Sequence, residues 1–175
     1  MGALASYRPV DPHEIEMVRL TREFVGSHED CFERSQSAGH VTGSAWIVDL
    51  DREYVLLTHH LKLGKWLQLG GHADGDPDVL AVALREAREE SGLEEIRPLS
   101  KGIFDVDVHR IPRRGDEKEH LHFDVRYLLE ADRRHALRLT SESRGLAWVK
   151  VAEVERLTRE ESVLRMVRKT FLLPR

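Results

Sequence analysis

Apolar and polar residues in the first 70 positions follow two different periods. In segment 13–32 the apolar residues recur at helical spacing, which predicts an amphipathic helix that Gly26 can interrupt. Segments 39–49 and 54–59 are rich in β-branched and aromatic residues and are separated by a short polar turn, which predicts a β-hairpin. The apolar segment 66–69 predicts another strand, which leads into Gly70 and Gly71.

The next segment, 77–91, has the pattern of a second helix. Its apolar face is formed by Leu80, Ala83, Leu84 and Ala87. Asp76 is suited to cap this helix, Pro77 to occupy its first position, and Gly92 to lie just past its end.

The remainder of the chain alternates again and then returns to helical spacing. Segments 103–111 and 120–129 predict two strands joined by the loop 112–119, and 145–151 predicts a last strand. Segments 151–157 and 161–172 predict helices. Strands interleaved with helices indicate an α+β protein with a mixed sheet between helices. Without repeats or a low-complexity linker, we expect one domain over 1–175, with 1–38 as a helical extension packed on it.

Composition narrows the class of protein further. The 175 residues are 41% hydrophobic and 33% charged, as expected for a soluble globular domain, and no apolar run reaches membrane-spanning length. The formal net charge of -4 argues against binding of extended nucleic acid but leaves room for a small anionic ligand. The single Cys31 excludes an internal disulfide and a cysteine-rich zinc site. With no signal-peptide pattern at the N-terminus, the expected location is cytoplasmic.

Three carboxylates crowd the end of the second predicted helix. Glu86 lies three and four residues before Glu89 and Glu90, so all three share a face. Like charges at this spacing oppose a helix unless a cation neutralises them, and magnesium binds through a few carboxylates together with substrate phosphates. A solvated charged face is the ordinary interpretation of such a run. The pair Gly70-Gly71 directly after a strand favours a site, because glycines allow close approach of the backbone to a ligand.

Aligned from Gly71, the segment GHADGDPDVLAVALREAREESGL resembles a known signature, with matching residues at Gly71, Arg85, Glu86, Glu89, Glu90, Gly92 and Leu93. The signature is that of the Nudix hydrolase family, G-x5-E-x7-R-E-U-x-E-E-x-G-U, where U is a bulky apolar residue. Ala87 is smaller than usual at the first U position, and Pro77 stands where the family has its first Glu.

This resemblance implies the Nudix fold, an α/β/α sandwich with a mixed, curved sheet. It implies a hydrolase that cleaves a diphosphate linkage in a nucleoside diphosphate derivative or a nucleoside triphosphate. The implied cofactor is Mg²⁺ or Mn²⁺, held by Glu86, Glu89, Glu90 and the Gly70 carbonyl, with Arg85 as a bracing residue. The general base is left open between a glutamate of the helix, Glu89 or Glu90, and Glu142 in the loop before the last strand. The implied partner is a small nucleotide or another diphosphate, and the fold is compatible with a homodimer.

Pro77 keeps other interpretations open. With Asp76 assigned to the cap, Asp74 or Asp78 is expected to supply a substitute carboxylate, or the metal arrangement is altered. A catalytically weak or inactive nucleotide-sensing module is the alternative function. An isomerase of the isopentenyl diphosphate type has a similar fold but needs a cysteine near the site, and Cys31 is remote from it in sequence.

Polar residues also line one face of two predicted strands. His120, His122, Asp124 and Arg126 alternate with apolar residues, and Asp105, Asp107 and His109 do the same in the preceding strand. One wet face is common in antiparallel pairs, yet Asp is depleted in strands, so a substrate or metal surface is the second interpretation. Arg126 is then a candidate phosphate clamp, and His122 with Asp124 a candidate metal site or acid–base pair. His72 is expected at the mouth of the site, although local loop packing explains it equally well.

Overall fold

The computed structural model describes residues 2–113, 115, 118–141 and 143–174. Within them, eight strands form one mixed sheet. The central strand β1 (Gly39–Val48) pairs antiparallel with β2 (Tyr54–His60) and β4 (Leu69–His72), and parallel with β7 (His120–Ala131). The outer pairs are completed by β3 (Trp66–Leu67), β5 (Ile96–Pro98), β6 (Asp105–Ile111) and β8 (Ser143–Lys150).

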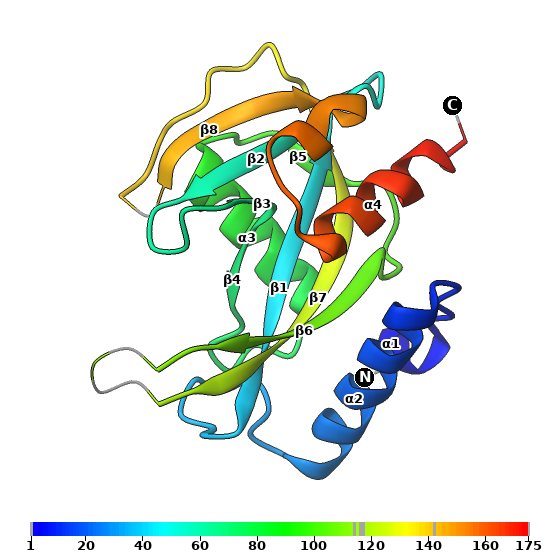
Figure 1. Ribbon diagram of the computed structural model, residues 1–175, viewed down its shortest axis with the longest axis vertical. Coiled ribbons are helices and arrows are strands. Elements are labelled where there is room, and N and C mark those ends of the chain that lie inside the picture. Colours follow the sequence, from blue (N-terminus) through cyan, green and yellow to red (C-terminus); the bar gives the residue numbers. More distant parts are fainter. Residues whose placement is uncertain (1, 114, 116–117, 142, 175) are drawn as a thin grey trace.

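Helices cover both faces of the sheet, with α3 (Val79–Ser91) behind β1 and α4 (Glu161–Phe171) in front of it in Figure 1. Because successive residues of a strand point to opposite faces, β1 supplies two cores. Ala45 and Ile47 pack on the α3 side with residues of α2 (Pro12–Ser27), while Trp46 and Val48 pack on the α4 side. Every residue of β1 is buried as a result. The predicted α+β class with a mixed sheet between helices is confirmed.

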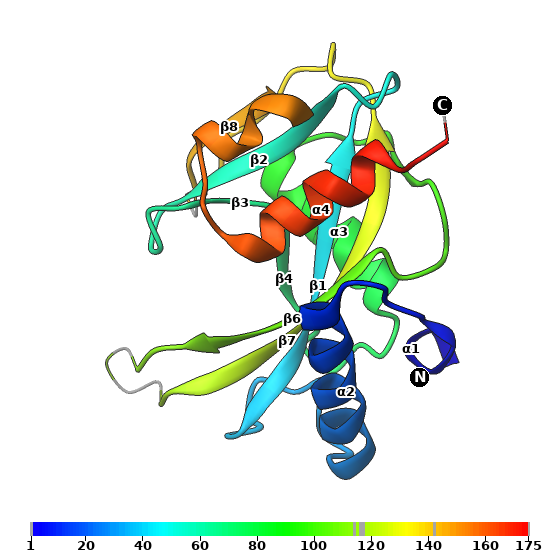
Figure 2. The ribbon, with the colours of Figure 1, turned by 45° about the vertical axis from the view of Figure 1, so that its right-hand side comes forward.

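The N-terminal helices lie beside β6 (Figure 2). Asp11 caps α2 by accepting hydrogen bonds from the backbone N–H groups of His13 and Glu14. Met17 and Val18 of α2 pack against Val106. The helix ends at Ser27, earlier than the predicted limit near residue 32.

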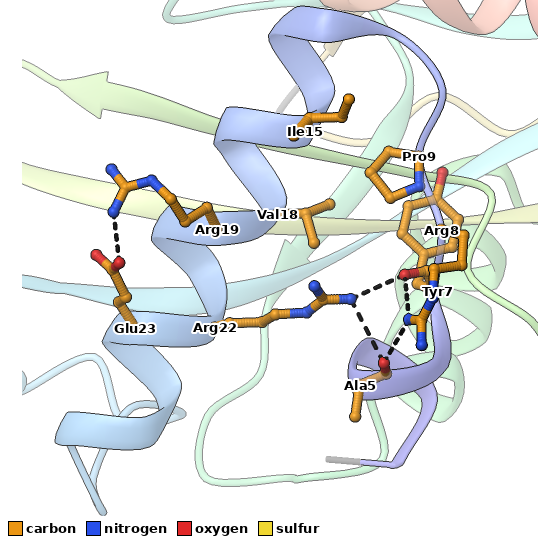
Figure 3. Close-up of a pocket in the computed structure, with 9 residues that line it drawn as sticks. All are labelled: Ala5, Tyr7, Arg8, Pro9, Ile15, Val18, Arg19, Arg22 and Glu23. Atoms are coloured by element: carbon orange, nitrogen blue, oxygen red, sulfur yellow. Dashed lines mark hydrogen bonds and ion pairs between the residues drawn. The ribbon is translucent and has the colours of Figure 1, made fainter.

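A short helix, α1 (Gly2–Ser6), was not predicted. The guanidinium of Arg22 donates to the carbonyls of Leu4 and Tyr7, at 2.8 Å in each case, and so ties the first residues to α2. Figure 3 shows the bond to Tyr7. β5 was also missed, because three residues are too few to show a period.

The start of α3 corrects the predicted cap. The carboxylate of Asp78 accepts from the N–H of Ala81, so the helix begins at Val79 and Pro77 precedes it. Asp76 instead accepts from the N–H of Asp78 in the turn before the helix. The predicted end is confirmed, since Gly92 has a left-handed φ of 72° that glycine adopts without strain. After β8, residues 151–156 form a 3₁₀ helix, η1 (Val151–Arg156).

No helix in the described ranges combines the length and hydropathy that crossing a bilayer requires.

Candidate functional site

The three candidate carboxylates lie on α3 beside the glycine pair of β4. A side chain at Gly71 would overlap the carboxylate of Glu86, so the absence of one makes room for this carboxylate against the sheet. The side chain of Glu86 is 14% exposed and that of Glu89 is 62% exposed. The carboxylate face of α3 therefore runs from the sheet out to solvent.

Arg85 connects this helix to β4. Its Nη1 donates to Oε1 of Glu86 at 2.6 Å, and its Nη2 donates to the carbonyl of His72 at 3.0 Å. Oε2 of Glu89 lies 3.6 Å from Nη1 of Arg85. This arrangement offsets part of the repulsion among the carboxylates and fixes the orientation of Glu86 relative to the turn after Gly71.

The donor set suits a hard divalent cation. Glu86, Glu89 and Glu90 offer carboxylate oxygens from one face of a helix, and such oxygens are the ligands that Mg²⁺ and Mn²⁺ prefer. Gly70 pairs with Ser44 of β1 and directly precedes Gly71 in β4, so the carbonyl of Gly70 lies at the same end of the strand as Gly71. The assignment of these four residues to a metal stays a prediction. Glu142, the alternative general base, lies outside the described residues.

The aspartates near Pro77 have other partners. Asp74 forms an ion pair with Arg34, at 2.5 and 3.0 Å, and this hydrogen bond lowers the pKa of Asp74. Asp78 is the cap of α3 and Asp76 holds the preceding turn. The expected substitute carboxylate therefore has to be sought elsewhere, and Arg85 is already braced by Glu86 and the His72 carbonyl.

The polar faces of β6 and β7 meet, as their alternation predicts. Asp105 pairs with Arg126, Asp107 with Asp124, and His109 with His122. Burial, however, separates this surface into two parts: an ionic part near α4 and a histidine part at the other end.

The ionic part contradicts two predictions. Arg126 is 2% exposed and donates to Asp124 at 2.7 Å and to Asp105 at 3.2 Å, so it is not available to clamp a phosphate. Asp124 also accepts from the hydroxyls of Thr42 and Ser44, at 2.9 and 2.7 Å, which occupy the oxygens that a second metal would need. Both residues belong to the interior of the protein.

Two cations of α4 complete this buried ionic network. Arg165 donates to both oxygens of Asp105 at 2.8 Å, and Lys169 donates to Asp105 at 2.6 Å. Burial opposes ionisation of Asp105 and Asp107, but hydrogen bonds and the nearby cationic charges lower the pKa of both. The i,i+4 spacing of Arg165 and Lys169 on one helix is visible in the sequence, but their pairing with Asp105 is not.

The histidine part contains His72 and His122, both predicted, and His40, which sequence analysis missed. The rings of these three residues approach one another, with centroids 4.8 to 5.0 Å apart. Burial, together with neighbouring positive charge, lowers the pKa of His72 to about 4 and that of His122 to about 2. The rings of His72 and His122 are therefore neutral at neutral pH. In the sequence, His40 could be recognised only from its place in β1, where it shares a face with Thr42 two residues later.

A shallow pocket of about 560 Å³ lies elsewhere, between the N-terminal segment and α2 (Figure 3). It is lined by Arg22, Arg19 and Ile15 among others, and Arg22 is occupied with backbone carbonyls. None of the candidate site residues lines this pocket, so the candidate site lies at α3 and not here.

The chain combines a mixed sheet, a glycine pair in β4 and the acidic helix α3 that follows it. This combination defines a class of α+β proteins. Residues 40–170 match the family model of the NUDIX domain. Because this match covers most of the sequence, the chain belongs to the Nudix hydrolase family, and the resemblance drawn from the signature is confirmed.

Solved structures agree on the fold. A C. elegans Ap4A hydrolase binary complex has a TM-score of 0.56 at 16% identity, covering 75% of this chain and 95% of that one. RenU, a Nudix hydrolase from M. smegmatis, has a TM-score of 0.58 at 20% identity, covering 78% and 89%. The NUDIX domain of Shewanella oneidensis NrtR complexed with ADP ribose has a TM-score of 0.55 at 17% identity, covering 86% and 96%. No curated protein sequence matches the chain.

Proposed function

We propose that the protein is a divalent-metal-dependent hydrolase that cleaves a diphosphate linkage in a nucleoside diphosphate derivative or a nucleoside triphosphate. The observation that carries this proposal is the acidic face of α3 held against Gly71, with Arg85 bridging Glu86 and the His72 carbonyl. Family membership supports the reaction class, since Nudix hydrolases typically act on diphosphate linkages.

This proposal assigns roles in metal binding, positioning and proton transfer. Glu86, Glu89 and Glu90, with the carbonyl of Gly70, would hold Mg²⁺ or Mn²⁺. When bound, such an ion lowers the pKa of water and stabilises negative charge on phosphate oxygens. Arg85 is a positioning residue that fixes Glu86 through the 2.6 Å ion pair. Glu89, which is largely exposed, can accept the proton of the attacking water, and Glu142 is the alternative base.

The substrate class rests on the relatives. One similar structure is named an Ap4A hydrolase and another is complexed with ADP ribose, and both named compounds contain a nucleoside joined to a chain of phosphates. His72, at the end of β4, remains our candidate for contact with such a substrate. His122 lies on the same face two strands away and belongs to the same candidate surface.

A substrate panel tests this function. Nucleoside triphosphates, ADP-ribose and dinucleoside polyphosphates are incubated with Mg²⁺, with Mn²⁺ or with chelator, and released phosphate or nucleoside monophosphate is measured. We expect metal-dependent turnover of at least one compound and its loss in Glu90→Gln. Glu94→Gln is the matched control, because Glu94 is an exposed glutamate just after the end of α3. Metal-independent turnover, or full activity of Glu90→Gln, would contradict the assignment.

A nucleotide-sensing module is the second candidate, favoured by one observation. Pro77 replaces the first glutamate of the signature, and the flanking aspartates are committed to Arg34 and to the start of α3. Nucleotide binding without turnover on the whole panel would select this function.

The isomerase interpretation gains no support. Cys31 is 2% exposed within the core that contains Phe24 and Val41, and burial raises the pKa of its thiol.

A further inference from the structure

Three histidines from three adjacent strands converge on the face of the sheet opposite α3. His40 of β1 is paired with His122 of β7, and Thr42 of β1 is paired with His72 of β4. Residues two apart in a strand share a face, so this register brings all three side chains to one place. The ring centroids are separated by 4.9 Å for His40 and His72, 4.8 Å for His40 and His122, and 5.0 Å for His72 and His122.

The nitrogens are close enough to share an ion. Each residue offers one ring nitrogen, and these three atoms lie within 4.8 Å of one another. Three points so spaced fit in a circle of radius about 2.8 Å, whereas a zinc–nitrogen bond measures ~2.0–2.1 Å. Binding would therefore require each ring to move by less than about 1 Å.

We propose that His40, His72 and His122 bind a transition-metal ion of the zinc class, at a site separate from the carboxylates of α3. The donor set is all imidazole, which suits Zn²⁺, Co²⁺, Ni²⁺ or Cu²⁺, while Mg²⁺ takes oxygen ligands. Three protein nitrogens leave a fourth coordination position for water or another small ligand, as in zinc sites of the open type.

A fourth histidine, His120, orients one of the ligands. Nδ1 of His120 lies 2.8 Å from the carbonyl of Lys118, to which it can only donate. With the proton of His120 on Nδ1, the lone pair of its Nε2 can accept a hydrogen bond from the N–H at Nε2 of His122, 3.3 Å away. This leaves the lone pair of His122 on Nδ1. Hydrogen bonds of this kind to the far nitrogen fix the tautomer and orientation of metal-binding histidines.

The two sites share the strand β4. His72 follows Gly71 directly, and its backbone carbonyl accepts the hydrogen bond of Arg85. The side chain of His72 thus serves the histidine site while its backbone braces the helix of the carboxylate site. An ion held by the three histidines would tie β1, β4 and β7 together at this end of the sheet.

Metal binding by the intact chain tests the proposal without reference to catalysis. The protein is stripped with chelator, returned to excess Mg²⁺, and titrated with Zn²⁺ against a chromophoric competitor, and bound zinc is then measured by elemental analysis. We expect one equivalent of zinc per chain. Co²⁺ in place of zinc should give the strong visible absorption of a four-coordinate ion, a signal that a six-coordinate oxygen site does not produce.

Matched variants locate the ion. His122→Gln should lower zinc affinity by more than roughly 100-fold, beyond the ~10–100-fold typical of losing an outer hydrogen bond. His135→Gln, an exposed histidine elsewhere, and Glu90→Gln should both retain it. His40→Gln repeats the test from β1, with circular dichroism confirming that each variant folds.

The opposite results would overturn the proposal. They are no zinc bound in the presence of Mg²⁺, unchanged affinity in a folded His122→Gln, loss of zinc in Glu90→Gln, or a cobalt spectrum of six-coordinate type.

Discussion

Two groups of carboxylates look alike in the sequence and differ in the structure. The aspartates of β6 and β7, which are Asp105, Asp107 and Asp124, are at most 7% exposed and are held by Arg126 and by cations of α4. On α3, the side chains of Glu86 and Glu89 are 14% and 62% exposed, and both contact Arg85. The first group is neutralised from within the chain, whereas the second extends to solvent, from which an external cation can approach it.

This difference separates carboxylates that stabilise the fold from carboxylates that are available to a ligand. Carboxylates taken out of water are tolerated when cations and donors surround them, and removal of one partner is then costly. Carboxylates at the surface cost little to the fold whether or not they are paired. Substitutions in the first group should therefore change stability, and substitutions in the second should change activity.

The largest effect is expected from Arg165→Met. Asp105 would lose the forked ion pair whose two bonds measure 2.8 Å, and a buried charge would be left undercompensated. We expect the free energy of unfolding to fall by about 3–5 kcal/mol in chemical denaturation. Arg168→Met on the same helix is the control, because Arg168 is 52% exposed and should change stability by less than about 0.5 kcal/mol. Equal effects of the two substitutions would erase the distinction between the groups.

Glu86→Gln probes the other side of the comparison. The substitution keeps shape and removes a carboxylate that we assign to the metal, so hydrolysis should drop by about 100-fold or more, or about 2.7 kcal/mol. Stability should change by less than about 1 kcal/mol, since relief of repulsion on α3 offsets the lost pair with Arg85. Turnover assays and thermal denaturation on the same preparation measure both quantities. A large loss of stability with normal turnover would place Glu86 in the structural group instead.

How far the sequence reaches differs between these groups as well. The alternation of β6 and β7 correctly predicted one shared polar face, because side-chain period is local. It did not predict that Arg126 is buried, since its burial depends on α4, where Ser162, 36 residues later in the chain, accepts hydrogen bonds from the guanidinium. Tertiary neutralisation has no local pattern.

The signature around α3 could be recognised in the sequence because it is local. Its residues lie within one strand, one turn and one helix, and the matching positions remain adjacent in the fold. The cap was predicted two residues early because Asp76 and Asp78 are both good caps, and only the backbone path decides between them. His40 was missed because the parallel pairing of β1 with β7, which brings it to His122, cannot be deduced from either strand alone.

A smaller effect is expected from acid, which should remove the stability provided by the buried aspartates. The pKa values of Asp105 and Asp107 are lowered in the folded protein, so the stability they provide is complete above the unfolded value near ~3.9 and is lost as pH falls below it. Each carboxyl contributes a slope of up to about 1.4 kcal/mol per pH unit in that range. Denaturation between pH 5 and pH 2, roughly the window of carboxylate titration, should show a shallower slope in Asp107→Asn. An unchanged slope in a folded variant would contradict the role of Asp107 in the network.

The smallest effect is expected from Pro77→Glu, which restores the carboxylate of the family signature. Position 77 is exposed and precedes the cap at Asp78, so a glutamate there should fold without strain, at a stability cost below about 1 kcal/mol from the lost proline. Arg85 already donates to Glu86 and to the His72 carbonyl, so a new carboxylate at position 77 would compete with these partners for the guanidinium. We expect turnover to change by less than about threefold, or about 0.7 kcal/mol. Pro77→Ala separates the backbone effect from the carboxylate. If Pro77→Glu alone raised turnover by tenfold or more, the acidic face of α3 would be one carboxylate short, and the bracing of Arg85 would be insufficient to replace it.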